Sequence, residues 1–166
     1  MEYISDAQPG STLLIQKSEP ETIAFQLESI LRTAPLSKTT NGVRIKTWPS
    51  PAASTASDIH FEDIIMDNVA NPIVLDQEYC PWNQCKKEIP SKIKISNVSF
   101  KNIRGTSSTP VAVKIACAKG LPCERVEMTD IDLKYSGNQG PVTSQCSNVH
   151  PTITRVPKPL ACFTKS

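Results

Sequence analysis

The sequence predicts an all-β chain: a β-solenoid, in which short strands stack into parallel sheets around an apolar interior. Two observations predict this fold. One segment recurs at a nearly fixed period, and apolar and polar residues alternate with period two inside each copy. A third observation is the combination of 14 prolines with only 5% aromatic residues, which favours short strands joined by loops.

The repeat is the strongest of these signals. Its three copies are SDIHFEDIIMDNV (57–69), SKIKISNVSFKNI (91–103) and CERVEMTDIDLKY (123–135). Aligned at a period of 34 and then 33, they place Ile59 opposite Ile93. Asp63, Asn97 and Asp130 then share one corner, where short polar side chains stabilise turns. A further strand, in NPIVLDQEY or PVAVKIAC, is expected to complete each turn of the solenoid.

The beginning of the chain has a different character. We expect an N-terminal segment over residues 1–36 and a solenoid domain over residues 37–166. Within the segment, Ser18 and Glu21 have capping-box spacing, and apolar residues follow at helical intervals. This pattern predicts an amphipathic helix over about 20–33 that packs on the domain, with a partner-binding helix as the alternative.

Charge and hydropathy exclude two classes of partner. The net charge of +2 gives no basic field for nucleic acid. No apolar run approaches the ~20 residues that a membrane span needs.

The opening residues, MEYISDAQPGSTLLIQ, contain no recognisable signal peptide.

The six cysteines indicate a secreted protein. An even number in near-neighbour pairs is typical of disulfides, whereas zinc ligands usually lie closer together. Asn97 also begins an Asn-Val-Ser glycosylation sequon, a weak signal in the same direction. Other connectivities stay open, but proximity favours the pairs Cys80–Cys85, Cys117–Cys123 and Cys146–Cys162.

One strand, NGVRIKTWPS over residues 41–50, carries the candidate binding residues. In a strand Arg44 and Lys46 share one face, about 6.6 Å apart, with Trp48 next in line. Such an alternation is more often a solvated face than a binding site. Trp48 is either a platform for a sugar ring or a partly buried residue before proline.

These segments together resemble a known family. NGVRIKTWP, SDIHFEDIIMDNVANPIVLDQEYCPWNQC and SKIKISNVSFKNIRGT resemble the C-terminal half of plant polygalacturonases (glycoside hydrolase family 28), most closely the pollen-type and exo-acting members. The resemblance covers about residues 37–162. It implies a right-handed, pectin-lyase-like parallel β-helix that is partial here, secretion to the cell wall, and hydrolysis of α-1,4-linked galacturonic acid. The implied partner is polygalacturonate; we expect a monomer without cofactor or metal.

The resemblance also assigns the site. The family motif Arg-Ile-Lys matches Arg44, Ile45 and Lys46, and the family's binding tyrosine matches Tyr79. The cations would hold a galacturonate carboxylate, which a guanidinium can bind through two hydrogen bonds. We expect no catalytic role for His60 or His150.

The chain departs from the family in its catalytic motifs. Asn-Thr-Asp, Asp-Asp and Gly-His-Gly, which supply the acid and the base, do not occur in it. We read Glu62-Asp63 as structural. The hypothesis is a truncated polygalacturonase that keeps the carboxylate site and is inactive alone. The alternatives are a non-catalytic pectate-binding module and a non-functional truncated product.

Overall fold

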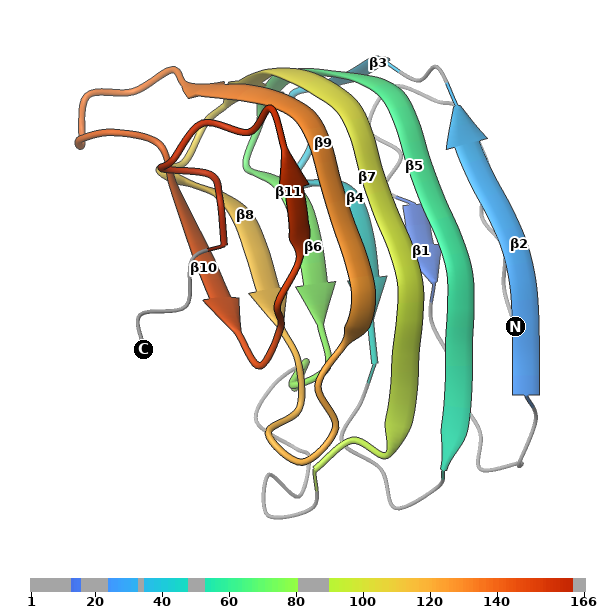
Figure 1. Ribbon diagram of the computed structural model, residues 1–166. Coiled ribbons are helices and arrows are strands. Elements are labelled where there is room, and N and C mark those ends of the chain that lie inside the picture. Colours follow the sequence, from blue (N-terminus) through green and yellow to red (C-terminus); the bar gives the residue numbers. More distant parts are fainter. Residues whose placement is uncertain (1–12, 16–23, 33–34, 48–52, 81–89, 163–166) are drawn as a thin grey trace.

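The computed structural model describes residues 13–15, 24–32, 35–47, 53–80 and 90–162 (Figure 1). Every regular element in these ranges is a β-strand. Figure 1 shows the long strands β5, β7 and β9 curving side by side in front of β4 and β6. None of the described residues forms a helix that is long and apolar enough to cross a bilayer.

The strands form two sheets in which every pairing is parallel. Sheet A has the order β1 (Leu13–Ile15), β4 (Asn41–Lys46), β6 (Asn71–Asp76), β8 (Val111–Ala116), β10 (Thr143–Ser147). Sheet B has the order β11 (Thr152–Thr154), β9 (Glu124–Tyr135), β7 (Ile93–Ser107), β5 (Ser54–Val69), β2 (Ala24–Arg32), and β3 (Pro35–Ser37) also pairs with β5. From β5 to β11 the chain alternates between the sheets, so the predicted all-β parallel β-helix is confirmed, and β6 and β8 are the strands expected to complete each turn.

The interior is built from rows of apolar side chains that repeat from turn to turn. Phe61 lies opposite Phe100, and Phe100 opposite Met128. The two phenylalanine rings are stacked, with centroids 5.4 Å apart and an angle of 8° between their planes. Each side chain in the row is buried between its neighbours in the turns on either side. Removing these apolar surfaces from water is the main contribution of the alternating pattern to stability.

The predicted alignment of the second repeat is wrong by five residues. Ile59 lies opposite Val98, not Ile93. The cause is an internal echo in β7, where apolar-x-apolar-x-Asn occurs twice in succession, ending at Asn97 and at Asn102. Both alignments place apolar residues opposite apolar residues. The protein adopts the register that stacks the rings of Phe61 and Phe100.

Each long strand turns at two corners rather than one. Asp63, Asn102 and Asp130 form one corner, since Asn102 occupies the position that was assigned to Asn97. Asn97 lies at the other corner with Asp58 and donates a hydrogen bond to its carboxylate. All five have a positive φ between 50° and 61°, the left-handed region that Asn and Asp tolerate best.

The expected helix over 20–33 is wrong for residues 24–32, which form strand β2; the rest of that range lies outside the described residues. β2 pairs with β5 from Ala24 opposite Thr55 to Arg32 opposite Glu62. The same sequence also alternates with period two at its start. A short helix is only marginally stable by itself because its nucleation is costly, whereas the strand gains a hydrogen-bonded neighbour in β5. The predicted domain division after residue 36 stays a prediction, and β3 crosses it.

Two of the three predicted disulfides are confirmed. Cys117–Cys123 closes the loop between β8 and β9, and Cys146–Cys162 joins β10 to the C-terminal segment. Cys80 is also disulfide-bonded, whereas its predicted partner Cys85 lies outside the described residues.

Candidate functional site

The candidate site lies on the outer face of sheet A, on β4. Val43 and Ile45 point into the interior and are almost completely buried. Arg44 and Lys46, which alternate with them, therefore lie on the opposite face, as expected from the sequence. That face is partly covered, because Arg44 is half-buried and Lys46 is only 8% exposed.

Tyr79 covers both cations. It follows the end of β6, the strand next to β4 in sheet A. The guanidinium carbon of Arg44 and the Nζ atom of Lys46 each lie 4.6 Å from the centroid of its ring. The structure thus brings together all three residues that the resemblance assigned to substrate binding, in an arrangement that cation–π attraction stabilises.

The electrostatics of this cluster favour an anionic ligand. Burial lowers the pKa of Lys46, and the positive charge of Arg44 lowers it further. The Nε atom of Arg44 is buried and has no hydrogen-bond partner among the residues that the structure describes. A buried donor without an acceptor is costly, so a ligand oxygen at this position would satisfy it.

Beside the cluster lies an ion pair that the sequence reading did not find. Lys114 Nζ is 2.8 Å from Asp76 Oδ2, and the backbone N–H of Glu78 donates to Asp76 Oδ1 at 3.0 Å. Val74 separates Arg44 from Lys114 in one row of adjacent strands. Aligning VRIK of β4 with VKIA of β8 would have placed Arg44 and Lys114 at the same position, two turns apart.

A buried glutamine holds the segment that carries Tyr79. Gln77 is completely buried. Its Nε2 donates to the carbonyl oxygen of Ile93 at 2.6 Å, and its Oε1 accepts from the backbone N–H of Ala118 at 2.9 Å. Its own N–H donates to the carbonyl oxygen of Ala116 at 2.8 Å. These bonds tie the end of β6 to the beginning of β7 and the end of β8.

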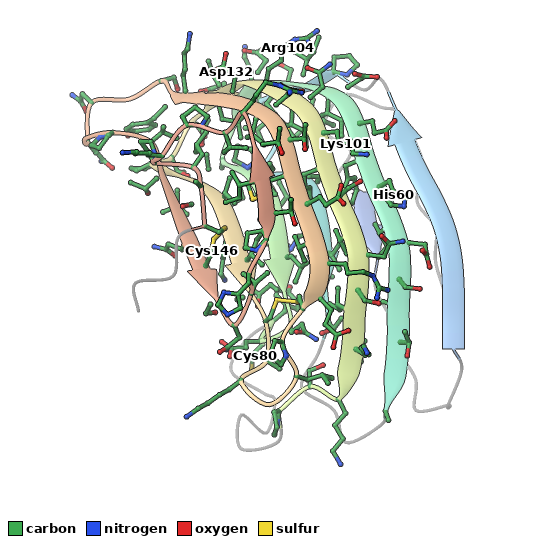
Figure 2. All side chains as sticks on the ribbon, in the orientation of Figure 1. His60, Cys80, Lys101, Arg104, Asp132 and Cys146 are labelled. Carbon is green, nitrogen blue, oxygen red and sulfur yellow. A yellow bond between two sulfur atoms is a disulfide. The ribbon has the colours of Figure 1, made fainter. Side chains whose placement is uncertain are left out.

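The remaining predicted residues lie elsewhere. His60 is on β5 in sheet B, where its Nδ1 is 2.7 Å from the hydroxyl of the buried Ser99 (Figure 2). Asn97 and Ser99 of the sequon are thus both hydrogen-bonded within sheet B, and glycosylation there stays a prediction. His150 is exposed in the C-terminal segment, and Trp48 lies outside the described residues.

Comparison with known proteins shows what the chain is similar to. The family model described as "Glycosyl hydrolases family 28" matches residues 30–162. A "Polygalacturonase" of Brassica napus is 54% identical over 133 residues, which cover 80% of this chain and 34% of that protein. An "Exopolygalacturonase" of Oenothera organensis is 56% identical over 122 residues, or 74% and 34%. A "Polygalacturonase" of Gossypium hirsutum is 49% identical over 154 residues, or 92% and 36%. The chain therefore spans about a third of the length of the curated relatives it matches.

Proposed function

Because the chain belongs to glycosyl hydrolases family 28, we propose that it carries the part of a polygalacturonase that holds a carboxylate of polygalacturonate. Arg44 and Lys46 bind this carboxylate, and Tyr79 lines the site beside them. The activity to which this site contributes is hydrolysis of the α-1,4-galacturonosyl bonds of pectin in the plant cell wall. The names of the relatives support this assignment, since all three are polygalacturonases or exopolygalacturonases.

The observation that carries the proposal is the position of the two cations within 4.6 Å of one tyrosine ring. Every unit of polygalacturonate bears one carboxylate beside an apolar ring face. A guanidinium can bind two carboxylate oxygens, and the Arg44 Nε has no other partner among the described residues; the neighbouring ammonium adds charge. A neutral glucan offers nothing to this pair of cations, so the site selects uronic acids.

We further propose that these 166 residues bind polygalacturonate without cleaving it. Inverting glycosidases need one protonated carboxyl to assist the leaving oxygen and one carboxylate to activate water. The sequence contains no Asp-Asp, Asn-Thr-Asp or Gly-His-Gly motif to supply these groups. General acid–base groups contribute roughly 10²–10⁴-fold each, so hydrolysis without them is negligible.

Binding and hydrolysis are tested on the same set of proteins. Calorimetric titration with oligogalacturonates compares the wild type with Arg44→Ala and Lys46→Ala. Each substitution removes charge-assisted bonds and is expected to weaken binding by at least on the order of tenfold. Arg104→Ala and Lys134→Ala are matched controls, because both residues are exposed on sheet B and their loss changes the net charge equally. Both controls should bind like the wild type.

Three results would contradict parts of the proposal. Equal binding by Arg44→Ala and the wild type would remove the carboxylate site. Release of reducing ends from polygalacturonate by the wild type, above the Arg44→Ala background, would show that the chain cleaves pectin by itself. Protein that does not fold when expressed alone would favour the remaining alternative, a truncated product without function.

The two confirmed disulfides support the expected secreted location, and fractionation of plant tissue into cell wall and cytosol would test it.

A further inference from the structure

The ion pair between Lys114 and Asp76 lies directly beside the cation cluster. Asp76 is opposite Lys46 in the register of β6 and β4. Parallel neighbours are about 4.8 Å apart, and both side chains lie on the outer face of sheet A. The carboxylate of Asp76 is therefore within reach of the Lys46 ammonium, and it would neutralise that charge if it turned toward it.

Asp76 is instead held by other groups. Oδ2 accepts from Lys114 Nζ at 2.8 Å, and Oδ1 accepts from the backbone N–H of Glu78 at 3.0 Å. Its side chain is 9% exposed, while that of Lys114 is 44% exposed. The long lysine side chain reaches diagonally across from β8, where its own register partner is Val74. Lys46, meanwhile, forms no ion pair with any residue in the described ranges and lies over Tyr79.

We propose that Lys114 is a positioning residue for the carboxylate site: by holding Asp76, it keeps Lys46 available for the anionic substrate. This inference rests on the proposed function of Arg44 and Lys46. Without Lys114, the Asp76 carboxylate would pair with the Lys46 ammonium. An arriving uronate would then meet a neutralised cation and a like charge beside it.

A direct role for Lys114 is the competing explanation. Its ammonium could bind a second carboxylate of the same polymer, because it projects from the same face two strands away from β4. The two explanations differ in what Asp76 does after Lys114 is removed. If Lys114 acts through Asp76, neutralising Asp76 restores the site; if Lys114 contacts substrate, neutralising Asp76 restores nothing.

A double-mutant cycle on the full chain separates them. The proteins are wild type, Lys114→Met, Asp76→Asn and the double variant, with Lys134→Met as the matched control for loss of one exposed strand lysine. Met keeps the alkyl stem of Lys114 on the sheet. Lys114→Met should weaken oligogalacturonate binding on the order of tenfold, a typical coupling for neighbours in one charge network. The double variant should bind within about twofold of wild type, and Asp76→Asn should bind at least as tightly as wild type.

A second measurement needs no ligand. The pKa of the Lys46 ammonium, which burial lowers in the wild type, is followed by NMR through its Cε and Nζ signals. It should rise in Lys114→Met, because an adjacent carboxylate favours the charged form, and return in the double variant. An unchanged Lys46 pKa in Lys114→Met, or binding by the double variant as weak as that of Lys114→Met, would overturn the inference. If Arg44→Ala binds like the wild type, the proposed function fails, and the Lys46 titration still decides whether Lys114 controls Asp76.

Discussion

The outer faces of the two sheets carry similar charged residues but pair them differently. On sheet B, charges and amides lie close together: Lys94 bonds Glu124 at 3.0 Å, and both carboxylate oxygens of Asp130 accept from Arg155. His60, Lys101, Arg104 and Asp132 all project from this face (Figure 2). On sheet A, Arg44 and Lys46 share one tyrosine ring, and neither forms an ion pair with another residue of the described ranges.

This difference distinguishes the structural residues of sheet B from the proposed binding residues of sheet A. Hydrogen bonds from Arg155 lower the pKa of Asp130, and hydrogen bonds from Ser57 and Asn97 lower that of Asp58. In both cases the fold itself supplies hydrogen-bond donors to the carboxylate. On sheet A the fold lowers the pKa of Lys46, and within the described part of the chain the Arg44 Nε has no acceptor. A buried charge that the fold disfavours and a buried donor that lacks an acceptor are expected where a bound ligand supplies the missing partner.

The largest expected effect concerns the interior that supports both faces. Phe100→Ala removes a completely buried ring that stacks on Phe61. The free energy of unfolding should fall by about 3–5 kcal/mol, because the cavity adds to the lost transfer energy. Urea unfolding followed by circular dichroism measures the loss. Phe100→Leu, which fills most of the space, should cost clearly less; equal losses would show that the ring contact with Phe61, rather than the filled volume, supplies the stability.

The next effect should be confined to sheet B. Asn102 has a φ of 50°, donates to Asp63 at 2.6 Å and accepts from Arg104 at 2.9 Å. Asn102→Ala should lower the free energy of unfolding by about 1–2 kcal/mol, because alanine is strained in the left-handed region. Asn102→Gly, which tolerates this φ, should lose only about 0.5 kcal/mol. Neither change should alter oligogalacturonate affinity, and a parallel loss of binding would mean that the two faces are coupled.

The same asparagine shows where sequence reasoning succeeds and where it stops. Period-two alternation correctly predicts parallel strands, the buried rows and an outward Arg44 and Lys46. It does not fix the register of β7, because Asn97 and Asn102 each end an identical apolar pattern. The two alignments are distinguished by the pairing with β5, in which Phe100 lies opposite Phe61. The five-residue error in the predicted register assigns Asn97 to the corner that Asn102 occupies. It does not change which residues of β7 are buried.

Two further features depend on contacts between distant segments. Residues 24–32 satisfy a helical and an alternating pattern, and the free edge of β5 decides for the strand. Tyr79 was assigned through family resemblance, and its distance to Arg44 and Lys46 follows from the neighbouring positions of β4 and β6.

Lys114 and Gln77 were missed because their partners, Asp76 and Ile93, are defined by the fold rather than by spacing.

A smaller effect concerns Lys46, one of the two neighbouring cations on sheet A. Lys46→Met should increase the free energy of unfolding at pH 7, by a few tenths to about 1 kcal/mol, because a partly desolvated charge beside Arg44 is removed. The same variant should lose affinity for oligogalacturonates. Urea unfolding and calorimetry on one preparation measure both changes. A destabilised Lys46→Met would show that this lysine is a structural residue like those of sheet B.

The pH dependence of that gain has a defined sign. The pKa of Lys46 is lower in the folded chain than its ordinary value of 10.5. Between these two values the unfolded chain binds more protons, so the wild type gains stability as the pH rises. The advantage of Lys46→Met should therefore be complete at neutral pH and shrink as the pH approaches 10.5. An advantage that is constant over this window would mean that burial does not disfavour the ammonium.

The smallest effect should come from a lysine of sheet B that has its acid. Lys94 and Glu124 are bonded at 3.0 Å, but their side chains are 47% and 51% exposed. Water screens such a pair, so Lys94→Met should change the free energy of unfolding by no more than about 0.5 kcal/mol and leave oligogalacturonate binding unchanged. The pair Lys94→Met and Lys46→Met makes the same chemical change on the two faces. Only the change on sheet A should weaken binding while stabilising the fold, and these opposite effects are expected of a binding residue and not of a structural one.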